Sequence, residues 1–181
     1  MRYQLDIHLT EEIYLDFNLF TSIEAKAARK AVIRGRILFL SIMLVCLALV
    51  ALINGPSIYS FCYAGFIGLF SVLYMILFKK FLKRNIKNHM KFLKKTGKLP
   101  FDPQNTLEFY EDKLIDISPN LRTEQNYHGI ERVCIVSRRF ILLYSSSVGA
   151  YIIPEQQAKA QLDLDEFIGF IKSKCSNIEY Y

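Results

Sequence analysis

The side chains that could hold a metal ion or act as a nucleophile are scattered along the sequence. No cysteine lies within four residues of another, the four being Cys46, Cys62, Cys134 and Cys175. Zinc sites and disulfide frameworks need cysteines at short, regular spacings, so we interpret these as small apolar residues. Among the histidines, His128 has Glu131 and Cys134 nearby, but no fourth ligand completes a site. We therefore expect neither a metal site nor a disulfide framework.

Other polar groups fit turns and strand edges. A catalytic centre needs a nucleophile beside a base, or carboxylates paired in an apolar setting, and the sequence shows no such pattern. We assign Glu111-Asp112 and residues 145–147 to turns. Arg138-Arg139 precedes a predicted strand, where a solvated edge is favoured over contact with a phosphoinositide-like or acidic partner. The sequence predicts a protein that is not an enzyme, without catalytic, cofactor-binding or metal-ligating residues.

The sequence contains one long apolar block. From Ile37 to Phe78 it holds no Asp, Glu, Lys, Arg or His. Its halves, Ile37–Ile53 and Ile58–Phe78, contain 17 and 21 residues. As helices they would measure about 25 Å and about 31 Å, close to the ~30 Å of a bilayer core. Between them, Asn54-Gly55-Pro56-Ser57 offers a glycine for positive φ and a proline suited to a helix start. We predict a transmembrane helical hairpin, with two buried helices of a soluble bundle as the less favoured alternative.

Basic residues flank both ends of this hairpin and are missing from its tip. The flanking residues are Lys26, Arg29, Lys30, Arg34, Arg36, Lys79, Lys80, Lys83, Arg84, Lys87 and Lys91. The positive-inside rule places such flanks in the cytoplasm. We expect a multi-pass protein of the plasma (inner) membrane with both termini cytoplasmic and residues 54–57 outside.

Small residues recur along both predicted spans. They are Ser60, Ala64 and Gly68 in the second span and Ala48, Ala51 and Gly55 in the first. Small residues let membrane helices approach closely, so we expect the two helices to pack along them, with Ala48 opposite Ala64. Packing within one chain is favoured over a homodimer, which stays the alternative.

The basic segment 79–98 continues the helical pattern. Its apolar stripe consists of Leu82, Ile86, Met90 and Leu93. No helix breaker separates Phe78 from Lys95, so we expect one continuous helix rather than a separate amphipathic helix on the leaflet. Gly97 and Pro100 should end it, before a linker over residues 99–103.

Residues 101–181 change to strand-like patterning. Predicted strands cover 106–110, 113–118, 121–127, 132–136, 139–145 and 150–154. A helix follows, capped by Asp163 or Asp165, with an apolar face of Leu164, Phe167, Ile168 and Ile171. The predicted fold class is a membrane α-helical hairpin plus an α+β cytoplasmic domain, a small antiparallel rolled sheet or barrel closed by the C-terminal helix.

The first 25 residues should pack on the same domain. Residues 2–9 alternate in polarity, and Thr10 with Glu11 and Glu12 begins an amphipathic helix. A lone strand is not stable in water, so we expect it to pair with the C-terminal sheet. The predicted organisation is 1–25 packed on the cytoplasmic domain, 26–98 as the hairpin with its basic extension, and 101–181 as the domain itself.

This layout resembles the YcxB-like family of bacterial membrane proteins. The segments that carry the resemblance are LTEEIYLDFNLF, the hairpin, TLEFYEDKLIDIS and FILLYSSSVGAYIIPEQQ. The resemblance implies a two-helix membrane hairpin before a C-terminal domain of bacterial pleckstrin-homology-like (PH-like) type. It implies a fold and no biochemical role.

Charge bears on the choice of partner. Residues 101–181 hold 8 Lys/Arg and 12 Asp/Glu, a net charge of −4, whereas nucleic-acid binders place basic charge on the folded domain. We expect no nucleic-acid partner. The sequence favours a membrane-anchored interaction module that binds a membrane or cytoplasmic protein through a free sheet edge or open barrel end. A sensor of anionic lipid headgroups is the alternative.

The hairpin prediction is tested by membrane extraction. The full-length protein should stay in the membrane pellet after washes at high salt and at alkaline pH, because salt does not weaken the burial of two apolar spans. The measurement is the protein recovered in pellet and supernatant. Release by salt alone would show a peripheral protein held by charge.

Overall fold

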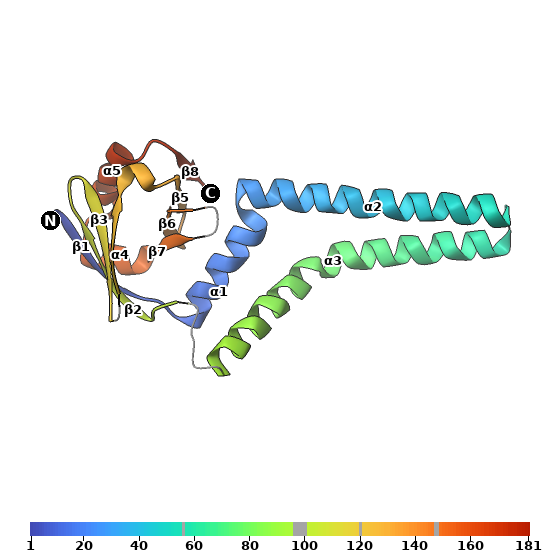
Figure 1. Ribbon diagram of the computed structural model, residues 1–181, viewed down its shortest axis with the longest axis horizontal. Helices are drawn as coiled ribbons and strands as arrows, with labels where there is room; N and C mark the ends of the chain where they lie inside the picture. Colours follow the sequence, from blue (N-terminus) through green and yellow to red (C-terminus); the bar gives the residue numbers. More distant parts are fainter. Residues whose placement is uncertain (56, 96–100, 120, 147–148) are drawn as a thin grey trace. The chain divides into compact units, whose positions relative to one another are not determined.

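The computed structural model describes residues 1–55, 57–95, 101–119, 121–146 and 149–181, apart from the side chains of Asn54 and Lys79. It divides into two compact units (Figure 1). The sheet unit comprises Met1–Tyr14 and Leu99–Tyr181, and the helical unit comprises Leu15–Lys98. The division falls inside helix α1 (Glu11–Leu19).

Helix α1 begins where the sequence predicts, because the Thr10 hydroxyl accepts a hydrogen bond from the Ile13 N–H at 3.3 Å. A π-helical turn, Phe20–Glu24, leads into α2 (Lys26–Asn54), which runs beside α3 (Ile58–Lys95) in Figure 1. The unbroken α3 confirms that the basic segment continues the second apolar helix. The predicted helix end at Gly97 and Pro100 lies outside the described residues.

A glycine makes the turn between α2 and α3 possible. Gly55 has φ 65°, a left-handed value that other residues adopt at a cost, as the sequence predicts. Its carbonyl accepts hydrogen bonds from the Ser57 N–H at 2.9 Å and the Ser60 hydroxyl at 2.8 Å. These bonds tie the end of α2 to the first turn of α3. The expectation for Pro56 lies outside the described residues.

Both helices contain a stretch that is long and apolar enough to cross a membrane, Lys26–Ile53 and Ile58–Phe78. None of the residues in their most apolar windows is buried. The core helix of a soluble bundle would bury one face, so this exposure favours a lipid environment for the hairpin.

The contact between α2 and α3 differs from the predicted one. Ser60 is buried and Ala64 half-buried, but Ala48, Ala51 and Gly68 are exposed. A Cβ added to Gly68 would meet no atom within 4 Å, so the backbones do not close together there. The half-buried positions of α3 recur at alternating intervals of four and three residues. The residue before Gly68, and not Gly68 itself, therefore lies on the covered face of the helix. Two of the three predicted α3 positions, Ser60 and Ala64, are therefore covered, whereas Gly68 and the predicted α2 positions Ala48 and Ala51 are not.

Sheet 1 is built from both ends of the sheet unit. Its order is β1 (Tyr3–His8), β2 (Gln104–Phe109), β3 (Lys113–Ser118), β4 (Leu121–Asn126), with all neighbours antiparallel. The register of β1 and β2 runs from Tyr3↔Phe109 to His8↔Gln104. The predicted pairing of the first strand with the C-terminal sheet is confirmed.

Sheet 2 follows in the sequence and is separate. Its order is β7 (Ala150–Pro154), β6 (Phe140–Tyr144), β5 (Arg132–Val136), β8 (Ile178–Tyr180). The 3-10 turn Tyr127–Gly129 separates β4 from β5, and β8 pairs in parallel along the second edge of β5. Because β8 occupies that edge, β4 and β5 do not pair. The expected single rolled sheet or barrel is therefore wrong, although a helical hairpin with an α+β unit is correct.

Two helices accompany the sheets, α4 (Glu155–Gln161) and α5 (Leu164–Lys174). The carboxylate of Asp163 accepts hydrogen bonds from the Asp165 and Glu166 N–H groups, each at 3.0 Å, so Asp163 is the predicted cap. The sequence analysis missed α4, which begins directly after Pro154, and the short strand β8.

The sheets and helices share one apolar core. Its buried side chains come from both sheets, α4 and α5, and include Leu5, Ile7, Leu107, Phe109, Leu114, Val133, Ile141, Leu143, Ile153, Ala158, Phe167 and Ile171. The Phe167 ring lies edge-on to the Phe109 ring at 4.9 Å and to the Tyr3 ring at 5.5 Å. These edge-to-face contacts hold α5 against sheet 1.

Two glutamines of α4 close the β1 edge of sheet 1. The Gln161 amide accepts from the Asp6 N–H and donates to the Asp6 carbonyl, both at 2.8 Å. The Gln157 amide makes the same pair of bonds with His8, again at 2.8 Å. Residues four apart on a helix are separated by about 6 Å along its axis, and residues two apart on a strand by nearly 7 Å, so the spacings match. Side-chain amides thus take the place of a further strand.

This edge closure can be tested with paired substitutions. The double variant Gln157→Ala/Gln161→Ala removes four hydrogen bonds, each contributing about 0.5–1.5 kcal/mol, so we expect a loss of about 2 kcal/mol or more. The Asp6 and His8 amides should exchange hydrogen faster. Gln156→Ala is the matched control, because Gln156 is exposed on the same helix. Equal stability and exchange in the double variant and the control would show that the glutamines do not support the edge.

Candidate interaction site at the open sheet edge

The side chains considered for metal binding do not converge. Cys134 is buried in β5, and its thiol donates to Glu179 Oε2 at 3.7 Å, whereas His128 is exposed in the 3-10 turn. Burial raises the pKa of the Cys175 thiol, which keeps it protonated and unreactive. Cys46 and Cys62 are exposed on α2 and α3. In the described part of the chain, no group of three or more His, Cys, Asp and Glu side chains could hold a metal ion.

The predicted turns have structural partners. Glu111 accepts from Lys174 at 2.8 Å and from Arg2 at 3.3 Å, and the bond with Lys174 lowers the pKa of Glu111. The carboxylate therefore joins the β2–β3 turn to α5 and to the residue before β1. At the other turn, the Ser145 and Ser146 N–H groups donate to the Gly149 carbonyl, while residue 147 lies outside the described residues.

Arg138-Arg139 forms the tight turn between β5 and β6. Arg138 has φ 62°, and its N–H donates to Glu155 Oε2 at 2.6 Å. Glu155 is buried and also accepts from Lys159 at 2.6 Å. The Lys159 bond, with the Arg138 N–H, lowers the pKa of Glu155 although burial opposes the shift. The buried carboxylate thus stabilises the left-handed backbone at Arg138, a role that the sequence analysis missed.

Asp116 in β3 is a second carboxyl group in an unusual setting. It is half-buried and accepts from Asn105 Nδ2 at 2.9 Å, and burial raises its pKa. The Asn105 Oδ1 atom is buried and has no hydrogen-bond partner among the described residues. A raised carboxyl pKa can mark a functional site. Here burial is the main cause of the shift, and the other described groups that affect this pKa are the Asn105 amide and the Asp102 carboxylate.

The hydrogen-bond alternation of sheet 1 shows which groups of β4 point outward. The Tyr110 N–H donates to the Lys113 carbonyl at 2.9 Å, so Lys113 and every second residue after it bond to β2. The intervening residues of β3 therefore face β4, where their partners are Leu121, Thr123 and Gln125. It follows that the main-chain groups of Arg122, Glu124 and Asn126 point away from sheet 1.

The two edges of sheet 1 differ in what meets these outward groups. On β1, Asp6 and His8 occupy equivalent positions and bind the Gln161 and Gln157 amides. On β4, the outward main-chain groups of Arg122 and Glu124 make no hydrogen bond within the described part of the chain. Leu121, at the start of this edge, is 64% exposed. β4 is therefore open at Arg122 and Glu124, whereas the outward carbonyl of Asn126 accepts a hydrogen bond from Gln125 Nε2 at 3.2 Å.

The edges of sheet 2 offer less for pairing. β7 ends with Pro154, which has no N–H, and β8 has only 3 residues. The exposed face around β4 carries both signs of charge, because Lys113 Nζ lies 2.7 Å from Glu124 Oε2. The longest edge with unpaired main-chain groups in the described sheets is thus β4.

Charge separates sharply between the two units. The sheet unit holds 9 Lys/Arg and 15 Asp/Glu, a net charge of −6, whereas the helical unit holds 14 and 2, a net charge of +12. The acidic unit contains the open edge, and the basic unit contains the two apolar helices.

No family model, curated protein or solved structure matches this chain. The resemblance to the YcxB-like family therefore stays a prediction, and the site is interpreted from the side chains and main-chain groups described above.

The role of Glu155 can be tested through pH. Its folded-state pKa is lowered, so its stabilising effect is present above its unfolded pKa of about 4.3 and is lost as the pH falls through the folded value. We expect Glu155→Gln to be less stable than the wild type at pH 7 by about 1–3 kcal/mol. The difference in Tm should shrink on acidification to pH 3.

Glu131→Gln serves as the control, because Glu131 is exposed. Thermal unfolding at several pH values provides the measurement. A difference between wild type and Glu155→Gln that is the same at pH 3 and pH 7 would contradict a charge-dependent anchor.

Proposed function

We propose that this chain is a membrane-anchored, non-catalytic interaction module that binds an extended segment of a partner protein as an added strand beside β4. The observation that carries the proposal is the asymmetry of sheet 1. One edge is closed by two glutamine amides, whereas on the other, the 6-residue strand β4, the outward main-chain groups of Arg122 and Glu124 have no partner in the described part of the chain.

The anchor is the α2–α3 hairpin. Its apolar stretches are long enough to cross a bilayer, and its basic residues lie at the ends away from Gly55. The positive-inside rule then places both termini in the cytoplasm and the tip outside, in the plasma membrane. A hairpin followed by an α+β unit is also the layout that a YcxB-like or PH-like protein would have.

Strand addition uses groups that the fold leaves unpaired. Arg122 and Glu124 each present one N–H and one carbonyl, and each new main-chain bond contributes about 0.5–1.5 kcal/mol. Alternate side chains of the added strand would supply specificity, with Leu121 as an exposed apolar contact. Tethering to the membrane raises the effective concentration of a membrane-bound partner, so a weak contact is sufficient.

Charge indicates the kind of partner. The sheet unit carries a net charge of −6, which favours a partner with a basic segment. The same charge is repelled by the anionic cytoplasmic leaflet. A protein partner is therefore favoured for the sheet unit over lipid headgroups, which remain the alternative.

A photo-crosslinking experiment tests this proposal in native membranes. A photo-reactive amino acid replaces Leu121 in the full-length chain, which is then combined with Glu124→Pro or Glu124→Ala. Both substitutions remove the carboxylate, but only proline removes the outward N–H, and proline is tolerated at an edge position of this kind. We expect the same crosslinked protein with the parent chain and Glu124→Ala, and its loss with Glu124→Pro.

Thr123→Pro is the register control. The Thr123 N–H bonds to β3, so this variant should unfold sheet 1, whereas Glu124→Pro should leave its Tm nearly unchanged. Undiminished crosslinking to the same protein in Glu124→Pro would refute strand addition. Crosslinks to lipid alone would instead support the headgroup sensor.

A further inference from the structure

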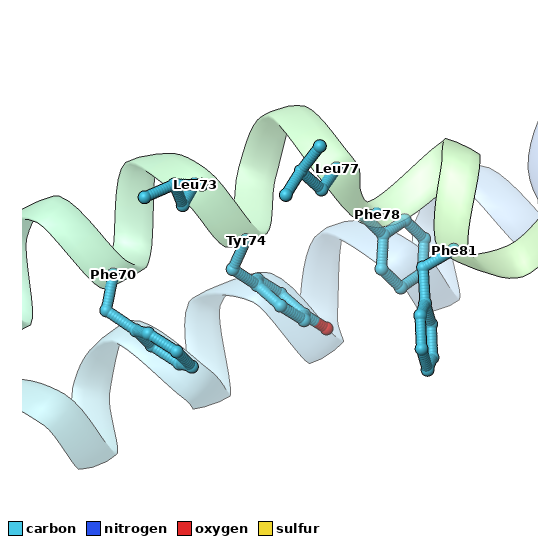
Figure 2. A pocket seen from close by; sticks show the side chains of 6 residues that line it. All are labelled: Phe70, Leu73, Tyr74, Leu77, Phe78 and Phe81. Carbon is cyan, nitrogen blue, oxygen red and sulfur yellow. The ribbon is translucent and has the colours of Figure 1, made fainter.

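An apolar groove runs along one face of α3, with a volume of about 390 Å³ (Figure 2). Its lining residues are Phe70, Leu73, Tyr74, Leu77, Phe78 and Phe81. They recur at intervals of three and four, so they share one helix face. In Figure 2 the rings of Phe70, Tyr74 and Phe81 point to the same side of the helix.

The length of the groove matches one lipid leaflet. From Phe70 to Phe81 the helix rises about 16 Å at ~1.5 Å per residue, and half of a ~30 Å hydrocarbon core is about 15 Å. The groove is also open, since Phe70 is 53% exposed and Phe81 is 64% exposed. It has the length and polarity to hold a single acyl chain.

Cationic side chains gather at one end of this groove. The Arg36 guanidinium of α2 lies 5.6 Å from the centre of the Phe78 ring. Its Nε atom is buried without a hydrogen-bond partner, and Arg36 forms no ion pair in the described part of the chain. Arg84 follows Phe81 by three residues, which places it on the groove face one turn further along α3.

We propose that the groove binds one anionic phospholipid of the cytoplasmic leaflet, with an acyl chain along the aromatic face and its phosphate group held by Arg36 and Arg84. This inference rests on the proposed membrane anchor and adds a specific lipid to it. Arginine suits a phosphate because its planar guanidinium donates two parallel hydrogen bonds. The apolar lining alone would accept any lipid, so the arginines provide the selectivity.

Charge argues against a second copy of the chain in the same place. Two copies that met along this face would bring their Arg36 and Arg84 side chains together, and like charges in a low-dielectric setting repel strongly. An anionic lipid supplies the opposite charge together with the apolar chain. The groove is thus better matched by a phospholipid than by a homodimer.

The chain has no tryptophan, so a single introduced tryptophan can report the lipid beside it. Phe70→Trp places the probe in the groove, and Leu69→Trp is the matched control, an adjacent position that is 62% exposed and does not line the groove. Each full-length variant is reconstituted in phosphatidylcholine vesicles. These contain the same small fraction of either dibrominated phosphatidylglycerol or dibrominated phosphatidylcholine, and quenching of fluorescence is measured.

For each tryptophan we compare quenching by the brominated anionic lipid with quenching by the brominated zwitterionic lipid, as a ratio. We expect this ratio to be about fivefold higher for Phe70→Trp than for Leu69→Trp. That ratio corresponds to ~1 kcal/mol, the usual attraction of one basic residue for an anionic lipid surface. Adding Arg36→Gln should lower the Phe70→Trp ratio to that of the control. Adding Lys83→Gln should leave it unchanged, because Lys83 is exposed on the opposite face of α3.

The remaining outcomes separate the lipid site from the anchor. Equal ratios for the two tryptophans would overturn the lipid site and leave the membrane anchor intact. Quenching of Leu69→Trp by both lipids, with none for Phe70→Trp, would mean that protein covers the groove and would also overturn it. No quenching of either tryptophan by either lipid would show that α3 is outside the bilayer, so the anchor itself would fail.

Discussion

The antiparallel pairing of β1 with β2 is the constraint on which the rest of the structure depends. It joins strands separated by the whole helical unit, with Leu5 opposite Leu107. Each doubling of a connecting loop adds only about 0.6 kcal/mol of closure entropy, so such a long insertion is tolerated. The buried Leu5 and Ile7 side chains complete the shared core, which makes the first strand part of the sheet unit rather than a tail.

A hairpin inserted between two paired strands must also return the chain to the side of the membrane that it left. Two membrane crossings satisfy that requirement, and a single crossing does not. The proposed topology therefore agrees with the strand pairing as well as with the basic flanks.

The main-chain hydrogen bonding at the two edges of sheet 1 then determines where the proposed partner strand would bind. An exposed edge is a hazard because it pairs with any extended chain. On β1 that hazard is removed by two amides that imitate a strand, at a spacing that only a helix aligned with the edge can provide. Within the described residues, the outward main-chain groups of Arg122 and Glu124 on β4 stay unpaired, next to an exposed leucine. The closed edge is β1, which is formed by the first residues of the chain. The open edge is β4, on the opposite side of sheet 1. This difference between the two edges is the observation on which the proposed strand addition at β4 rests.

Sequence patterns predicted the elements whose reasons are local and missed those whose reasons are tertiary. The apolar block, the glycine at residue 55, the Asp163 cap and the β2–β3 hairpin each depend on neighbours in sequence, and all are present. Helix α4 was missed because its start follows a proline and its purpose is the edge of a strand nearly 150 residues away. β8 is too short to show alternation, and its parallel pairing with β5 prevents the barrel that six consecutive strands suggested.

The seam between α2 and α3 was misplaced because small residues at regular spacing are consistent with several helix faces. Large side chains such as Phe39 and Tyr74, whose rings stack at 4.7 Å, lie between the helices instead.

The open edge could be identified only from the hydrogen-bond alternation of sheet 1, which no sequence pattern contains. The aromatic groove could have been noticed from the three- and four-residue spacing of Phe70, Tyr74, Leu77 and Phe81, but its meaning depends on Arg36 from the other helix.

The separation of charge would allow one chain to hold the two proposed contacts without interference between them. The helical unit carries a net charge of +12, with its basic residues beside apolar stretches, which suits an anionic leaflet and the proposed phospholipid. The sheet unit carries a net charge of −6 and has its open edge at β4, so the same leaflet repels it. An anionic lipid would therefore bind to the helices and not compete for the edge. A partner with a basic segment would be attracted to the edge and repelled by the helices. Under the proposed function, the acidic sheet unit would not need to contact the membrane to act there, because the hairpin would provide the location and the free edge the recognition.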